Sequence, residues 1–202
     1  MKPNKILIDA LLSEFSVRLE PFGFSPRLRH QEWRRRSPHG AHILHASIAN
    51  YEGGLGVLMS AAVKIEAVEK LVKPGAADTS TIGTFLENLA GLPPLHYGVA
   101  SIADVHLVSE NIVGLVVRFG EPFFTKYSDP ASVLALLMSD ERLAIQCSPS
   151  ELYRTMSVCA LLKLDGRNNE AAEYIARHLP DLRRNERPRL LEFAKSLGLA
   201  PS

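Results

Sequence analysis

The order of apolar and polar positions predicts a helix followed by a strand at the beginning of the chain. Apolar residues recur every three or four positions over residues 4–20, as on one face of an amphipathic helix, and Pro21 ends this pattern. Residues 27–36 have no helical stripe and lie between two prolines. We therefore predict a strand there, with Trp33 as its apolar anchor.

Two further strands are predicted at residues 41–51 and 55–65. Over 55–65 the odd-numbered positions are apolar, and this face of the strand is expected to meet the core because side chains alternate across a strand. The pair Gly53-Gly54 predicts a tight hairpin between the two strands, since glycine tolerates the positive φ of such turns. A helix over residues 57–73 is the competing interpretation.

The middle of the chain combines short strands with helices. β-Branched residues predict a fourth strand at 79–86, and a loop with a short strand at 97–100 follows. Apolar spacing predicts a helix over 104–120, which Gly120 and Pro122 end. A second, short helix is predicted from Asp129-Pro130, a capping residue followed by proline.

The last part of the chain is predicted to be helical. Ser148-Pro149-Ser150-Glu151 has the features of a helix start, with Ser148 as the cap. Two more amphipathic segments, 169–179 and 187–197, predict a helical hairpin followed by a third helix. We therefore expect an α+β domain over 1–143, with an antiparallel sheet of about four strands packed against helices, and a helical C-terminal subdomain over 144–202.

The segment joining these two parts, residues 140–147, is short and partly apolar. It is interpreted as a linker that lets the C-terminal helices dock on the first domain. The expected docking partners are the helix at 104–120 and the helix after Pro130, because the apolar stripes exceed what three short helices hide among themselves.

Composition and charge narrow the classes of function. The chain has 202 residues, 46% of them hydrophobic and 22% charged, with a net charge of +1. This composition is globular, and the balanced charge provides no global attraction to nucleic acid or anionic membranes. Because neither a signal peptide nor an apolar stretch of membrane-spanning length is apparent, we expect a cytoplasmic protein. Its two cysteines, Cys147 and Cys159, are expected to be buried thiols.

Several short motifs, taken in order, resemble a widespread bacterial domain-of-unknown-function family. They are Leu19-Glu20-Pro21-Phe22-Gly23-Phe24, Trp33 with the three arginines after it, Tyr51, Thr81-Ile82-Gly83 and Glu121-Pro122-Phe123-Phe124. The resemblance covers about residues 1–140. It implies an α+β fold and no particular activity. Small domains of this kind are also similar to immunity proteins of bacterial toxin systems, which act by binding.

Two basic clusters are the candidate binding residues. The first predicted strand has five arginines and one glutamate within ten residues, and the second cluster lies between the last two helices. The candidates are Arg27, Arg29, Trp33, Arg34, Arg35, Arg36, Arg183 and Arg184. The first cluster with Trp33 suits a nucleic-acid strand, but it equally suits a charged edge strand with Trp33 in the core.

Neither metal nor catalytic chemistry is indicated by the spacing of the polar residues. His30, His39, His42 and His45 lie close in sequence, but His42 and His45 are expected to point to opposite faces of a strand. The chain has no phosphate-binding loop, dinucleotide fingerprint, nucleophile elbow or zinc-protease motif. We therefore expect no catalytic residue, no metal and no cofactor.

These observations favour a non-enzymatic protein-binding domain with an immunity or regulatory role. The partner is expected to be another protein, with self-association left open and no membrane contact. A nucleic-acid-associated protein using the basic strand at 27–36 is one alternative. An enzyme whose histidine and carboxylate site assembles from separate segments is another.

Overall fold

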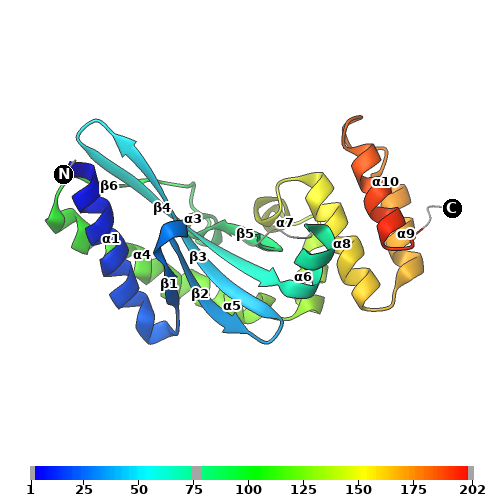
Figure 1. The fold of residues 1–202 in the computed structure, drawn as a ribbon, viewed down its shortest axis with the longest axis horizontal. Coiled ribbons are helices and arrows are strands. Elements are labelled where there is room, and N and C mark those ends of the chain that lie inside the picture. Colours follow the sequence, from blue (N-terminus) through cyan, green and yellow to red (C-terminus); the bar gives the residue numbers. More distant parts are fainter. Residues whose placement is uncertain (1–2, 74–78, 200–202) are drawn as a thin grey trace.

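An antiparallel sheet forms the centre of the computed structural model, which describes residues 3–73 and 79–199. Its described strands follow the order β1-β2-β3-β4-β5. β6 pairs with β4 as well, at residues 55–57, whereas β5 pairs with β4 at residues 60–63. Helices cover the sheet, and more helices lie beyond the end of β4 (Figure 1). This confirms the α+β class with an antiparallel sheet. The strands are β1 (Ser25–Arg27), β2 (Glu32–Ser37), β3 (Gly40–Tyr51), β4 (Gly54–Ile65), β5 (Ile82–Phe85) and β6 (Tyr97–Val99).

The segment predicted as one strand at 27–36 spans the last residue of β1, a turn and most of β2. A 3-10 turn, Leu28–His30, follows β1, and Gln31 has a left-handed backbone with φ 53°. This turn reverses the chain, so that β1 pairs back on β2 from Ser25 opposite Arg34 to Arg27 opposite Glu32. The prediction of a single strand was wrong because a 3-10 turn leaves no apolar period to detect.

The hairpin of β3 and β4 confirms the strands predicted at 41–51 and 55–65. The pairing is continuous from Gly40 opposite Ile65 to Tyr51 opposite Gly54, and Gly53 in the turn has φ 88°. The odd-numbered side chains of β4 are at most 2% exposed and form the middle of the core. They are Leu55, Val57, Met59, Ala61, Val63 and Ile65.

Helices α1 (Pro3–Leu19) and α4 (Ile102–Leu115) pack against each other, and α1 and α5 (Glu121–Tyr127) contact β4. Trp33 of β2 lies in this layer with no exposed surface. Its ring meets Phe15 edge-on at 5.5 Å, and its indole N–H donates to Ser16 Oγ at 3.0 Å. The only tryptophan of the chain therefore fixes α1 to the sheet.

The predicted helix over 104–120 does not end at Gly120. A π-helical turn, Val116–Gly120, follows α4 and leads directly into α5. Pro122 has no N–H to donate to the preceding turn, but at the start of α5 it takes a position that proline favours. The chain therefore continues as helix past the two residues that were expected to stop it.

The remaining helices form the C-terminal part and its supports. They are α2 (Glu66–Val72), α3 (Leu86–Leu89), α6 (Pro130–Leu137), α7 (Arg142–Cys147), α8 (Glu151–Leu164), α9 (Asn168–His178) and α10 (Arg187–Ser196). The segment interpreted as a linker at 140–147 contains helix α7, and the expected boundary between 143 and 144 falls inside it. The cap of α8 is Ser150, whose hydroxyl accepts from the N–H of Tyr153. Ser148, the expected cap, ends α7 instead.

Helix α8 connects the C-terminal helices to the rest of the molecule. It packs against α6, one of the two expected partners, and against α2, while α9 and α10 pack on α8. One hydrophobic cluster extends from Leu7 to Leu199 among the described residues. Cys147 and Cys159 are free and buried in it, as expected, and burial raises the pKa of both thiols to about 12. Within 3–73 and 79–199, no helix has the length and apolar character needed to cross a membrane.

Candidate functional site

Strand β2 sends its arginines to opposite faces of the sheet. Trp33 and Arg35 lie on the face of the sheet that the helices cover. Because side chains alternate along a strand, Arg34 and Arg36 lie on the opposite face. Trp33 is completely buried, so its ring is not accessible for stacking on a base. The arginines of the predicted cluster therefore do not form one continuous basic face.

Arg35 is held in place by contacts from three directions. Its Nη1 and Nη2 donate to the two carboxylate oxygens of Glu121, both at 2.9 Å, and Nη1 also donates to the carbonyl of Phe22 at 3.0 Å. Its guanidinium lies 4.6 Å from the centre of the Phe24 ring. A bidentate pair of this kind is geometrically specific. Arg35 thus ties α5 to the sheet.

His42, opposite Arg35 on β3, is the histidine most strongly affected by the fold. Burial, and secondarily the charge of Arg35, lower the pKa of His42 to about 4. Its ring stacks on Phe124 with the centres 4.7 Å apart. The imidazole is therefore neutral at pH 7 and has one N–H.

The contacts of His42 show which nitrogen has that hydrogen. Arg35 Nη2 lies 3.2 Å from Nδ1, and because an arginine only donates, Nδ1 is the acceptor. Nε2 then donates to Ser128 Oγ at 2.8 Å, and Ser128 donates onward to the carbonyl of Phe124. Since His42 gives a hydrogen to Ser128 and takes none from it, this pair does not activate a serine nucleophile. It is a structural network.

A basic groove of about 1150 Å³ lies along the end of β2 and the turn into β3. Five cationic side chains and one acidic side chain are among its described lining residues: Arg27, Arg34, Arg35, Arg36, Lys70 and Glu66. Arg27 and Arg34 share Glu32, at 3.7 and 2.8 Å, whereas Arg36 and Lys70 are exposed. Arg36 and Lys70 are therefore the cationic groups best placed to meet a ligand.

One edge of β2 is open at this groove. The pairing with β1 ends at Ser25 opposite Arg34, so the outer edge of residues 35–37 has no strand partner among the described residues. All three residues line the basic groove. An unpaired strand edge presents backbone N–H and C=O groups that another extended chain can bind.

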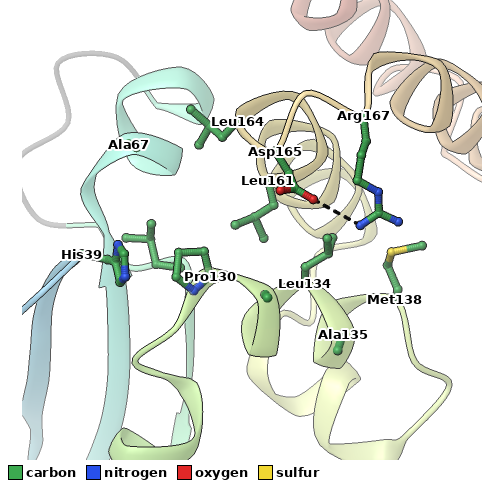
Figure 2. A pocket seen from close by; sticks show the side chains of 12 residues that line it. His39, Ala67, Pro130, Leu134, Ala135, Met138, Leu161, Leu164, Asp165 and Arg167 are labelled. Atoms are coloured by element: carbon green, nitrogen blue, oxygen red, sulfur yellow. Dashed lines mark ion pairs between the residues drawn. The ribbon is translucent and has the colours of Figure 1, made fainter.

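An apolar groove of about 530 Å³ adjoins the basic one. Figure 2 shows His39 and Pro130 at one end and Met138 and Arg167 at the other. Its lining comes from the turn between β2 and β3, the end of β4, α2, α6 and the end of α8, so it lies where the two parts of the chain meet. Arg167 pairs with Asp165 at its rim, with 3.5 Å between Nη1 and Oδ2.

The two grooves share His39 and Ala67 in their linings. The turn at residues 37–40 and the start of α2 meet there, and the N–H of Glu66 donates to the carbonyl of His39 at 3.0 Å. Together they form one continuous surface that changes from cationic to apolar.

The structure separates the two predicted basic clusters. Arg29 is exposed on the turn before β2 and does not line the basic groove. Arg183 and Arg184 are exposed between α9 and α10, which Figure 1 places at the far end of the molecule from β2. Sequence reasoning missed Lys70 and the whole apolar groove. The register of the β3–β4 hairpin could have indicated Lys70, because pairing of Gly40 with Ile65 places the residues after 65 beside the turn before Gly40.

Comparison with known proteins gave no match to a family model, to a curated protein or to a solved structure.

Proposed function

We propose that the protein is a non-enzymatic binding module that takes an acidic peptide segment of a partner protein into the basic groove. The observation that supports this most directly is the open edge of β2 at 35–37, inside a groove lined mainly by cationic side chains. A module that binds in this way would act in an immunity or regulatory role. The free buried thiols suit action in the reducing cytoplasm.

The backbone of the partner segment would extend the sheet. A peptide added to a sheet edge gains its affinity from main-chain hydrogen bonds and its specificity from alternate side chains. Arg36 projects from the open stretch of β2, and Lys70 approaches the same groove from α2. Aspartate or glutamate at alternate positions of the peptide would complement these charges.

The apolar groove provides an anchor beside the charged part. It continues from the basic groove at His39 and Ala67, and its apolar lining includes Pro130, Leu134 and Leu161. A bulky apolar side chain next to the acidic stretch would fill it, as anchor residues do at protein interfaces. The proposed ligand is therefore an extended acidic segment followed by an apolar residue.

Fluorescence anisotropy with defined probes tests this function. The first probe is a fluorescein-labelled peptide in which aspartate and valine alternate and a leucine–phenylalanine pair ends the chain. The second has serine in place of aspartate, and the third is a labelled single-stranded oligothymidylate. We expect the acidic peptide to bind, with an affinity that decreases as salt increases, and the serine peptide to bind much more weakly.

Charge-reversal variants locate the site. Arg36→Glu with Lys70→Glu should weaken binding of the acidic peptide about tenfold or more, which corresponds to ~1.4 kcal/mol. Arg183→Glu with Arg184→Glu is the matched control, because it reverses two exposed arginines outside the groove. Circular dichroism verifies that both double variants fold.

Three outcomes contradict the proposal. The acidic peptide does not bind, or it binds the two double variants equally well, or the serine peptide binds as tightly. Tighter binding of the oligothymidylate, lost in the Arg36→Glu and Lys70→Glu variant, would replace the proposal with the nucleic-acid alternative.

A further inference from the structure

Three potential metal ligands meet where the C-terminal helices turn back on one another. Glu151 is the first residue of α8, His178 is the last residue of α9, and Asp181 lies in the connection to α10. Each offers one ligand atom, and these atoms all lie within 4.8 Å of one another. Helices α8 and α9 pack together, which brings the start of one beside the end of the other.

The donor set fits a divalent transition metal. An imidazole with carboxylates is a common protein environment for Zn²⁺, which binds nitrogen and oxygen at about 2.0–2.2 Å and often keeps a water as its fourth ligand. Those bond lengths require donor atoms somewhat closer together than the 4.8 Å limit found here. Asp181 is exposed and Glu151 half-buried, so small side-chain rotations can close the set and leave one side open to water.

The surroundings fix the histidine and the turn. The ring of His178 packs on Tyr174, one helical turn earlier, with 4.2 Å between ring centres. The N–H of Asp181 donates to the carbonyl of His178 at 3.2 Å, and Arg187 donates to the carbonyls of Pro180 and Leu182. These contacts hold the ring of His178 and the backbone of the turn that carries Asp181 in place.

Two carboxylates and two arginines set the charge around the site. Glu151 and Asp181 bring two carboxylates to one place, and a divalent ion would neutralise both. Arg154 and Arg177 act electrostatically on the nearby Tyr174, so any cation bound here depends on both carboxylates to outweigh them. Cys147 and Cys159, the ligands that zinc would otherwise prefer, are buried in the core.

We propose that Glu151, His178 and Asp181 form a zinc site that clamps the start of α8 to the end of α9. The site is independent of the peptide groove, since none of its residues lines either groove. The sequence pattern does not indicate this site, because Glu151 and His178 are 27 positions apart along the chain.

Isothermal titration of the metal-free full-length protein with zinc chloride tests the site. We expect one zinc ion per chain, and a higher melting temperature when zinc is present. His178→Ala and Asp181→Asn should each weaken zinc binding about tenfold or more and abolish the zinc-dependent increase in melting temperature. Because Asp181 is exposed, the Asp181→Asn variant stays informative even where His178→Ala lowers stability.

The matched control is His106→Ala. The imidazole of His106 lies 3.2 Å from the carboxylate of Glu14, and among the described residues the two belong to no group of three potential ligands. Its removal should leave zinc binding unchanged. The proposal is overturned when the wild-type protein does not bind zinc, or when His178→Ala and Asp181→Asn bind it as tightly as His106→Ala does.

Discussion

Acidification should destabilise the protein through His42. The folded state holds the pKa of this imidazole at about 4, because the ring is buried and lies beside Arg35. In the unfolded chain the pKa returns to the ordinary value of 6.5. Below that value the unfolded state binds a proton that the folded state does not, so the free energy of unfolding falls as the pH falls.

The size of the effect follows from the two pKa values of His42, folded and unfolded. The whole difference corresponds to ~3.4 kcal/mol, lost between pH 6.5 and 4, because a tenfold change in proton affinity is worth about 1.36 kcal/mol. Between about pH 7.5 and about pH 5 the loss amounts to ~2 kcal/mol by the same relation. That is a large fraction of the stability of an ordinary domain.

Urea unfolding at the two pH values measures this loss. In His42→Gln the side chain keeps a hydrogen-bond donor and an acceptor but does not titrate. The free energy of unfolding of this variant should therefore fall by ~2 kcal/mol less than that of the wild-type protein between the two pH values. His39→Gln is the control, because His39 is exposed in the turn before β3 and should retain the full loss. Equal pH dependence in the wild-type protein and His42→Gln would refute the reasoning.

Two further substitutions test features of the fold. Burial raises the pKa of Glu87, and the nearby Tyr97 opposes this only in part. Neither carboxylate oxygen of Glu87 has a hydrogen-bond partner of normal geometry among the described residues. Glu87→Gln should therefore stabilise the protein by ~1–2 kcal/mol near neutral pH. The difference should shrink as the pH falls, because acid protonates the wild-type carboxyl. Thermal melts that show the same difference between variant and wild type at low and neutral pH would contradict this. A Cβ at Gly40 would lie 2.1 Å from the carbonyl oxygen of Lys64, whereas one at Gly98 would meet nothing within 4 Å. Gly40→Ala should lower the free energy of unfolding by about 2 kcal/mol or more, and Gly98→Ala should change it little. Equal melting temperatures of the two variants would contradict this, because the β3–β4 hairpin would then accommodate the added Cβ.

Local patterns predicted the elements whose causes are local. The alternation over 55–65 identified both β4 and its buried face, because every side chain on that strand obeys the same period. The cap and proline at Asp129-Pro130 located the start of α6 for the same reason. Helix α7 was missed because its six residues are too few to show a helical period, and β1 was missed because a 3-10 turn separates it from β2.

The candidate site was only partly predictable, because it depends on contacts between distant residues. The cluster at Arg27–Arg36 was recognisable as basic, but its charges differ in availability. Arg35 is neutralised by Glu121, which lies 86 residues away in sequence. The apolar stripes predicted that the C-terminal helices dock on the helix after Pro130, and α8 packs on α6. The apolar groove also needs His39 and Ala67, which come from other elements and which no pattern in either helix brings there.

The burial of Trp33 also gives the protein an internal optical reporter. Its fluorescence responds to the packing of α1 on the sheet, because its ring touches Phe15 and its indole donates to Ser16. The helices from α8 to α10 contain no tryptophan, so they contribute to far-ultraviolet dichroism but not to this emission. Coincident unfolding curves from the two signals would therefore show that the C-terminal helices and the sheet melt as one cooperative unit.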